Sequence, residues 1–233
     1  MAKKKQWKES ELRVAFNLER IVGIQTPLMK EWLDISMPDF DVFEQHTFDD
    51  VYSLGVKNML NWGEEDLKMK FLSKIVPLGN MIDEGHIVTF FDRPLKGVVN
   101  DIPLSIKSDF MMAKGFMDLY QTPYFHLQAG GVPQYKPERN PTGDSMAQLL
   151  EAFLIAQEKN KEDNIIIPLY GCEIVGGSWR FVVMDDRQYC ISTVYDSTNR
   201  EELLQIIAIL RKYKALLKER YMTPEPMVLK LDR

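Results

Sequence analysis

A change in hydrophobic spacing along the chain constrains its fold more than any other feature. Between residues 64 and 79 the apolar residues recur at the spacing of a helix face. From residue 86 the pattern changes to the alternation that is typical of β-strands, over residues 86–95, 102–115 and 123–128. The first half of the main region is therefore predicted to be a helix followed by three strands.

The second half repeats both kinds of pattern. Residues 145–160 predict a helix, and three strands are expected within residues 165–197, with Gly176-Gly177 as a hairpin turn. A last helix is expected over residues 201–220. Helices that alternate with groups of strands indicate an α/β protein with a mixed central sheet flanked by helices.

The length and composition suit one main domain with additions at both ends. The chain has 233 residues, of which 45% are hydrophobic, enough for a substantial core. We expect residues 59–221 to form the α/β domain, residues 1–58 an N-terminal helical extension, and residues 222–233 a tail. Within the extension, the acids and proline of residues 34–50 are typical of a loop with short helical turns.

Composition also argues against several classes of protein. No apolar run approaches the roughly 20 residues that cross a bilayer, so we expect no membrane association. The two cysteines, Cys172 and Cys190, do not make a zinc site and are expected to be core residues of strands in a cytoplasmic protein. A net charge of -5 disfavours a dedicated nucleic-acid binder but leaves room for an enzyme with a locally basic groove.

The residues that could carry chemistry follow two of the expected strands. Asp109 ends an alternating run, and Gln134, Tyr135 and Lys136 follow the third strand. A carboxylate, an amide oxygen and the carbonyl of Tyr135 are oxygen ligands of the kind that Mg²⁺ prefers. A lysine beside them could orient the attacking water and offset phosphoryl charge. These residues therefore predict a divalent-metal site suited to a phosphodiester.

Four further segments carry a resemblance to a known family. They are SDFMMAKG, PYFHLQ, YKPERNPTGDSMAQLLEAFLIAQ and PLYGCEIVGGSWRFVV, in this order along the chain. Together with the order of elements, they resemble the PD-(D/E)XK nuclease superfamily, in particular its uncharacterised bacterial branch. The resemblance covers about residues 60–215 and implies a restriction-endonuclease-like core.

The resemblance also implies roles for individual residues. Asp109 matches the metal-binding aspartate, Lys136 the catalytic lysine, and Gln134 the acid two residues before that lysine. Glu65, or its neighbour Glu64, matches a supporting acid, and Gln148 a helix glutamine near the site. The implied activity is hydrolysis of DNA phosphodiester bonds with Mg²⁺ or Mn²⁺, and the implied partners are DNA and a second copy of the chain.

Other interpretations of the same residues stay open. Glutamine is a weaker metal ligand than a carboxylate, and residues 129–134 look like an insertion, so an alternative register ends the strand at Gln128. Asp109 could be a turn or cap residue, and residues 136–139 a solvated loop. The second hypothesis is therefore a catalytically inactive nuclease fold that acts as a binding or scaffolding module. The third is an unrelated α/β protein with a small-molecule pocket.

Overall fold

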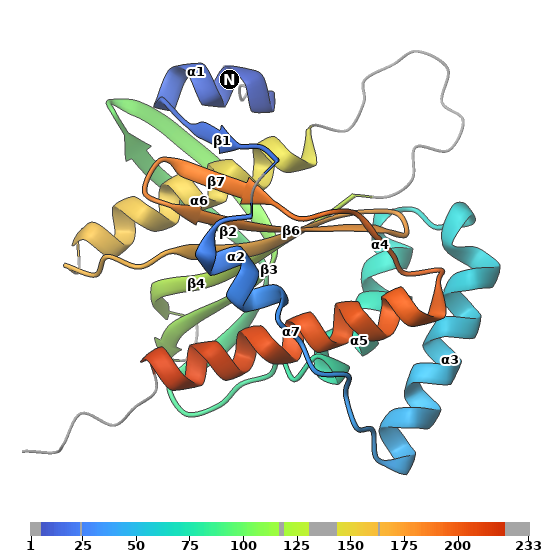
Figure 1. The fold of residues 1–233 in the computed structure, drawn as a ribbon. Helices are drawn as coiled ribbons and strands as arrows, with labels where there is room; N and C mark the ends of the chain where they lie inside the picture. The colour runs from blue at the N-terminus through green and yellow to red at the C-terminus, as the bar shows by residue number, and fades with distance from the viewer. Residues whose placement is uncertain (1–5, 24, 117–118, 131–143, 163, 222–233) are drawn as a thin grey trace, which may run out of the picture.

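The computed structural model describes residues 6–23, 25–116, 119–130, 144–162 and 164–221. Within this part of the chain, eight strands form one mixed, open sheet with helices on both faces (Figure 1). The α/β class and the mixed sheet flanked by helices are thereby confirmed. In the same residues, no helix is both long and apolar enough to cross a membrane.

The strands occur in the order β1-β7-β6-β5-β4-β3-β2 across the sheet, and β8 pairs with β6. The pairs β1–β7 and β4–β5 are parallel, and the other pairs are antiparallel. A parallel β4–β5 pair needs a crossover, which helix α6 supplies between these two strands. The strands are β1 (Glu19–Ile21), β2 (Ile87–Val99), β3 (Ile102–Phe116), β4 (Leu119–Gly130), β5 (Leu169–Val175), β6 (Ser178–Asp185), β7 (Gln188–Ile191) and β8 (Tyr195–Asp196).

The helices fall into a short N-terminal group, one crossover helix and one C-terminal helix. A π-helical turn, η2, lies between α4 and α5 in one continuous helical stretch. The elements are α1 (Glu9–Phe16), α2 (Pro27–Leu33), α3 (Val42–Asn58), η1 (Met59–Asn61), α4 (Glu64–Leu67), η2 (Lys68–Leu72), α5 (Ser73–Leu78), α6 (Ser145–Glu162) and α7 (Arg200–Tyr221).

Two apolar layers hold the helices against the sheet. One layer joins α2, α3, α5 and α7 to one face, and the other joins α1 and α6 to the opposite face. Figure 1 shows α7 crossing in front of the sheet with α3 and α5 beside it. Along β3, Phe110 belongs to the first layer and Met111 to the second, as expected for side chains that alternate between the faces of a strand.

Trp32 anchors the N-terminal region to the first layer. Its indole is fully buried and packs edge-on against Tyr170 and Phe181, with ring centroids 5.2 Å and 5.1 Å away. The indole N–H donates to the backbone carbonyl of Ile209 on α7 at 2.9 Å. A buried tryptophan with a satisfied N–H stabilises both its packing and its orientation, so α2 is fixed on the same core as the sheet and α7.

Gly171 allows the parallel strands β4 and β5 to approach the crossover helix. A Cβ atom at this position would lie 2.6 Å from the carbonyl oxygen of His126 and 2.8 Å from the ring of Phe153 on α6. Both distances are shorter than real Cβ contacts, so a larger residue would push the strands or the helix apart.

The local predictions have mixed outcomes. The helix expected over 145–160 and the hairpin turn at Gly176-Gly177 are confirmed. Cys172 and Cys190 are buried cysteines on strands β5 and β7, as expected. The loop expected over residues 34–50 is wrong in its second half, because α3 begins at Val42.

The start of α3 has a local physical reason. Asp41 accepts a hydrogen bond from the backbone N–H of Glu44, and the Glu44 carboxylate accepts one from the N–H of Asp41. This reciprocal capping satisfies two N–H groups that would otherwise lack partners at the first turn.

Candidate functional site

Asp109 is a buried carboxylate near the middle of β3. Its side chain is only 3% exposed, in a sheet whose other buried positions are mostly apolar. A charge is costly to bury unless it is paired and hydrogen-bonded. The fold must therefore supply a partner for the Asp109 carboxylate, and the identity of this partner indicates the role of the residue.

In β2 and β3, the alternation of side chains between the two faces of the sheet is interrupted near Asp109. Consecutive residues of a regular strand face opposite sides of the sheet, yet Asp109 and Phe110 both line one cavity, as do Phe91 and Asp92 on β2. Asp92 has a positive φ of 53°, a left-handed conformation that aspartate tolerates better than most residues. This local irregularity brings two carboxylates to the same side of the sheet.

Lys68 is the partner of Asp109. Its Nζ lies 2.6 Å from Oδ1 of Asp109 and 2.6 Å from Oε1 of Glu64, one turn earlier in the helix. Lys68 is the first residue of the π-helical turn η2. Such turns are rare and often occur at functional sites, because the extra residue turns neighbouring side chains in a new direction.

Two further carboxylates surround the same ammonium group. Oδ1 of Asp92 lies 3.7 Å from Nζ of Lys68, and Oε1 of Glu65 lies 3.8 Å from it. Lys107 contributes a second cation, 3.0 Å from Asp92. Four acids and two lysines thus meet here, so the cluster keeps an excess of negative charge.

The cluster controls the charge state of its lysine. Burial lowers the pKa of Lys68, but the hydrogen bonds to Asp109 and Glu64 outweigh burial and hold this pKa above its ordinary value. Lys107 likewise lowers the pKa of Asp92 through a hydrogen bond. Near neutral pH, Lys68 is therefore a fixed cation.

A cavity of about 500 Å³ opens beside these groups. This volume lies in the range of roughly 300–1,000 Å³ that is usual for small-molecule sites. One end is polar and contains Glu65, Lys68, Asp92 and Asp109. The rest is mainly apolar, and its walls come from η2, α5, the segment that follows α5, and β2 and β3.

Two of the predicted site residues, Glu65 and Asp109, line this one cavity. Gln148 lies half-buried in the first turn of α6 and does not line this cavity. Gln134, Tyr135 and Lys136 lie outside the described residues, so their roles stay predictions. Gln128, the end of the alternative register, is on β4 opposite Glu173 of β5.

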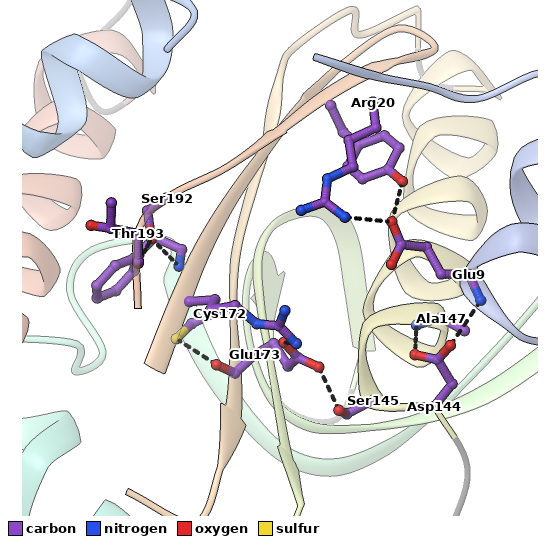
Figure 2. A network of polar contacts seen from close by, with 12 residues as sticks. Glu9, Arg20, Asp144, Ser145, Ala147, Cys172, Glu173, Ser192 and Thr193 are labelled. Atoms are coloured by element: carbon purple, nitrogen blue, oxygen red, sulfur yellow. Dashed lines mark hydrogen bonds and ion pairs between the residues drawn. The ribbon is translucent and has the colours of Figure 1, made fainter. Parts of the chain in front are cut away.

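A separate polar network holds the start of α6 (Figure 2). Asp144 accepts hydrogen bonds from the backbone N–H groups of Ala147 at 3.0 Å and Glu9 at 2.9 Å. Ser145 donates to the carboxylate of Glu173 at 2.5 Å, and this carboxylate also pairs with Arg180. These contacts cap α6 and tie it to α1 and β5, which gives these residues a structural role.

The donor set fits a divalent cation only in part. Within the described residues, no three His, Cys, Asp or Glu side chains are close enough to hold a metal ion by themselves. Mg²⁺, however, commonly binds through one or two carboxylates and keeps several waters. Asp109 and one neighbouring acid therefore meet the minimum, provided that the Lys68 ammonium moves aside or shares the carboxylate.

The patterns in the sequence did not mark Lys68 or Asp92 as site residues. The spacing of Glu64 and Lys68 does predict an ion pair one helical turn apart. Nothing in the local pattern connects Lys68 to Asp109, which lies on another element, and nothing marks Asp92 as the residue with a positive φ.

A buried histidine lies on the opposite side of the sheet. His126 of β4 is 1% exposed, and its Nδ1 lies 3.3 Å from the hydroxyl of Ser108. Because this hydroxyl donates to the carbonyl of Phe110, we assign the imidazole proton to Nδ1. Burial lowers the pKa of His126 to about 3.

This histidine should make stability depend on pH. Its folded pKa lies below its unfolded pKa, so the unfolded state binds the proton more readily, and stability falls as pH drops from about 6.5 towards 3. We expect the stability difference between wild type and His126→Asn to change by about 1.4 kcal/mol per pH unit within this window. Urea unfolding at several pH values measures it. A flat curve for His126→Asn would contradict the buried, neutral state of this histidine.

No protein-family model matches the chain, and no curated protein matches it in sequence. The function must therefore be argued from the cavity and its residues.

Proposed function

We propose that this chain is a Mg²⁺-dependent nuclease with a restriction-endonuclease-like core, and that it hydrolyses phosphodiester bonds of DNA. The observation that carries the proposal is the buried carboxylate of Asp109, held at the end of a cavity with Glu65 and a lysine beside it. Perturbed ionisable groups that converge in a cavity are typical of functional sites, although structural ion pairs share this property.

The order of strands supports the core assignment. A helical stretch precedes the antiparallel strands β2, β3 and β4, and α6 then leads to β5, which is parallel to β4. This is the α-β-β-β-α-β order that the resemblance implies. Asp109 lies on the second of these strands, and the segment with Gln134 and Lys136 follows the third.

The residues of the chain have separate tasks in this proposal. Asp109, with Glu65, Gln134 and the carbonyl of Tyr135, would hold the cation, which as a Lewis acid lowers the pKa of a bound water. Lys136 would orient the attacking water and offset negative charge on the phosphoryl group. Lys68 holds the Asp109 carboxylate in position through their ion pair at 2.6 Å.

The direct experiment is a nicking assay on supercoiled plasmid DNA. We expect nicked product in the presence of Mg²⁺ or Mn²⁺ and none in the presence of a chelator. A preparation that binds the metal but leaves DNA and RNA of every form intact would refute the nuclease proposal.

One observation favours a second candidate, a catalytically silent nuclease fold that serves as a binding module. The ammonium of Lys68 already neutralises Asp109 at 2.6 Å, so the carboxylate has less attraction for a metal. This candidate predicts nucleic-acid or protein binding that is unchanged by a chelator, together with no metal binding in calorimetry at millimolar Mg²⁺ or Mn²⁺. Measurable metal binding that depends on Asp109 would exclude it.

A further inference from the structure

The cavity beside Asp109 also has an apolar part, which the hydrolysis of a phosphodiester does not by itself require. A phosphate group and a hydrated cation need polar surroundings, and the acids and lysine at the Asp109 end supply these. The remaining walls come chiefly from Leu72, Val76, Met81, Ile82, Phe91 and Phe110. A substrate that reacts at Asp109 must therefore bring an apolar group into the same space.

Three apolar side chains that line this part of the cavity are exposed to solvent. The side chain of Phe91 is 60% exposed, Met69 is 72% exposed and Ile82 is 46% exposed. The Phe91 ring is held in place because it packs edge-on against Phe110, with the ring centroids 5.2 Å apart. The result is an accessible aromatic face at the mouth of the cavity, a surface on which a flat ring can stack.

Asp83, outside the acid cluster, adds a hydrogen-bonding group to the cavity wall. Oδ1 of Asp83 accepts from the backbone N–H of Thr89 at 2.7 Å and from the Thr89 hydroxyl at 2.5 Å. These bonds fix the Asp83 carboxylate on the cavity wall, and neither of them uses Oδ2. An ionised carboxylate only accepts hydrogen bonds, so it favours a ligand with an N–H group.

The segment that carries Asp83 is itself braced from α7. Lys214, whose side chain is 1% exposed, donates to the carbonyl of Ile82 at 2.7 Å and pairs with Glu84 at 3.5 Å. Lys218 pairs with the same Glu84 at 2.5 Å. The wall with Asp83 is therefore a built part of the fold, held by two lysines on both sides of the residue.

We infer that the apolar part of the cavity receives one unstacked nucleobase, and that the substrate is single-stranded or locally unpaired nucleic acid. This inference rests on the proposed function. The bases are the apolar, flat part of a polynucleotide, and a base inside a duplex cannot leave the stack without loss of pairing and stacking energy. Phe91 stacks on the base, and Asp83 accepts a hydrogen bond from an exocyclic amine such as that of adenine.

The first test measures binding of free nucleosides without any metal. We expect adenosine to bind with a millimolar dissociation constant, measured from NMR cross-peak shifts or by calorimetry. Phe91→Ala should weaken this binding about tenfold or more. Purine riboside lacks only the exocyclic amine, so wild type should bind it more weakly than adenosine. Asp83→Asn keeps an oxygen for Thr89 but presents an amide N–H to the ligand, so it should abolish this preference.

The second test compares single-stranded and duplex oligonucleotides of the same sequence. Wild type should bind the single strand more tightly, and Phe91→Ala should reduce the difference. Phe43→Ala and Asp50→Asn, at exposed positions of α3 away from the cavity, are the matched controls and should change neither preference.

The outcomes separate this inference from the proposed function. Nucleoside binding that Phe91→Ala and Asp83→Asn leave unchanged, or duplex binding as tight as single-strand binding, overturns the base pocket even if the protein nicks DNA. Binding that both variants alter as expected supports the base pocket even if a nicking assay shows no cleavage.

Discussion

Replacement of Lys68 by methionine is expected to lower the free energy of unfolding by about 3–5 kcal/mol, the usual cost when one partner of a buried ion pair is removed. The Lys68 side chain is 13% exposed and that of Asp109 is 3% exposed, so the replacement would leave a largely buried carboxylate without its nearest cation. Glu64, Glu65 and Asp92 would in addition repel Asp109, and Lys107, which pairs with Asp92, would be left as the cation of the cluster. Urea unfolding at neutral pH measures the change.

Two further variants make this prediction specific. The pair Lys70–Asp66, two positions along the same helix, has a similar length of 2.5 Å but is about half exposed, so Lys70→Met should change the free energy of unfolding far less than Lys68→Met. The double replacement Lys68→Met with Asp109→Leu should recover most of the lost stability, since no unpaired charge remains buried. Equal losses for Lys68→Met and Lys70→Met would contradict the buried pair.

Replacement of Asp109 or Lys136 by alanine is expected to lower metal-dependent nicking by about 10²–10⁴-fold, the range for the loss of a positioned acid–base group. Asp109 would lose its bond to the cation, and Lys136 its hold on the water and the phosphoryl charge. Rates of plasmid nicking under excess enzyme measure both effects.

The controls must separate catalysis from folding. Asp109→Asn keeps the shape of the side chain and should lose nicking while the variant still unfolds cooperatively. Lys161→Ala removes an exposed lysine that pairs with Glu158 at the end of α6, and its nicking rate should match wild type. Cleavage at the wild-type rate by both Asp109→Ala and Lys136→Ala would exclude these residues from the mechanism.

The elements that the sequence predicted well have local causes. Helix α6 combines a 3.6-residue apolar period with Asp144 as a capping residue, and both are visible in a short window. The alternation of β3 and the Gly176-Gly177 turn are equally local. The start of α3 differs from the expected loop even though its signal is local, because acids such as Asp41 and Glu44 are common both in loops and at the first turn of a helix.

The candidate site was predictable only in part for a different reason. Asp109 and Glu65 were found from their motifs, and the structure brings them to one cavity. The contact between Lys68 and Asp109 depends on how a helical turn docks on the sheet, and the interrupted alternation of side chains depends on one left-handed residue, Asp92. Such long-range and conformational facts have no signature in the spacing of residues along the chain.

A titration of Mn²⁺ into the metal-free protein by calorimetry tests the central claim most directly. Wild type should show one saturable binding event with a millimolar or tighter dissociation constant, and Asp109→Asn, folded to the same extent, should show none. The same binding curve for both proteins, or the absence of any binding by wild type, would contradict a metal-dependent site at Asp109.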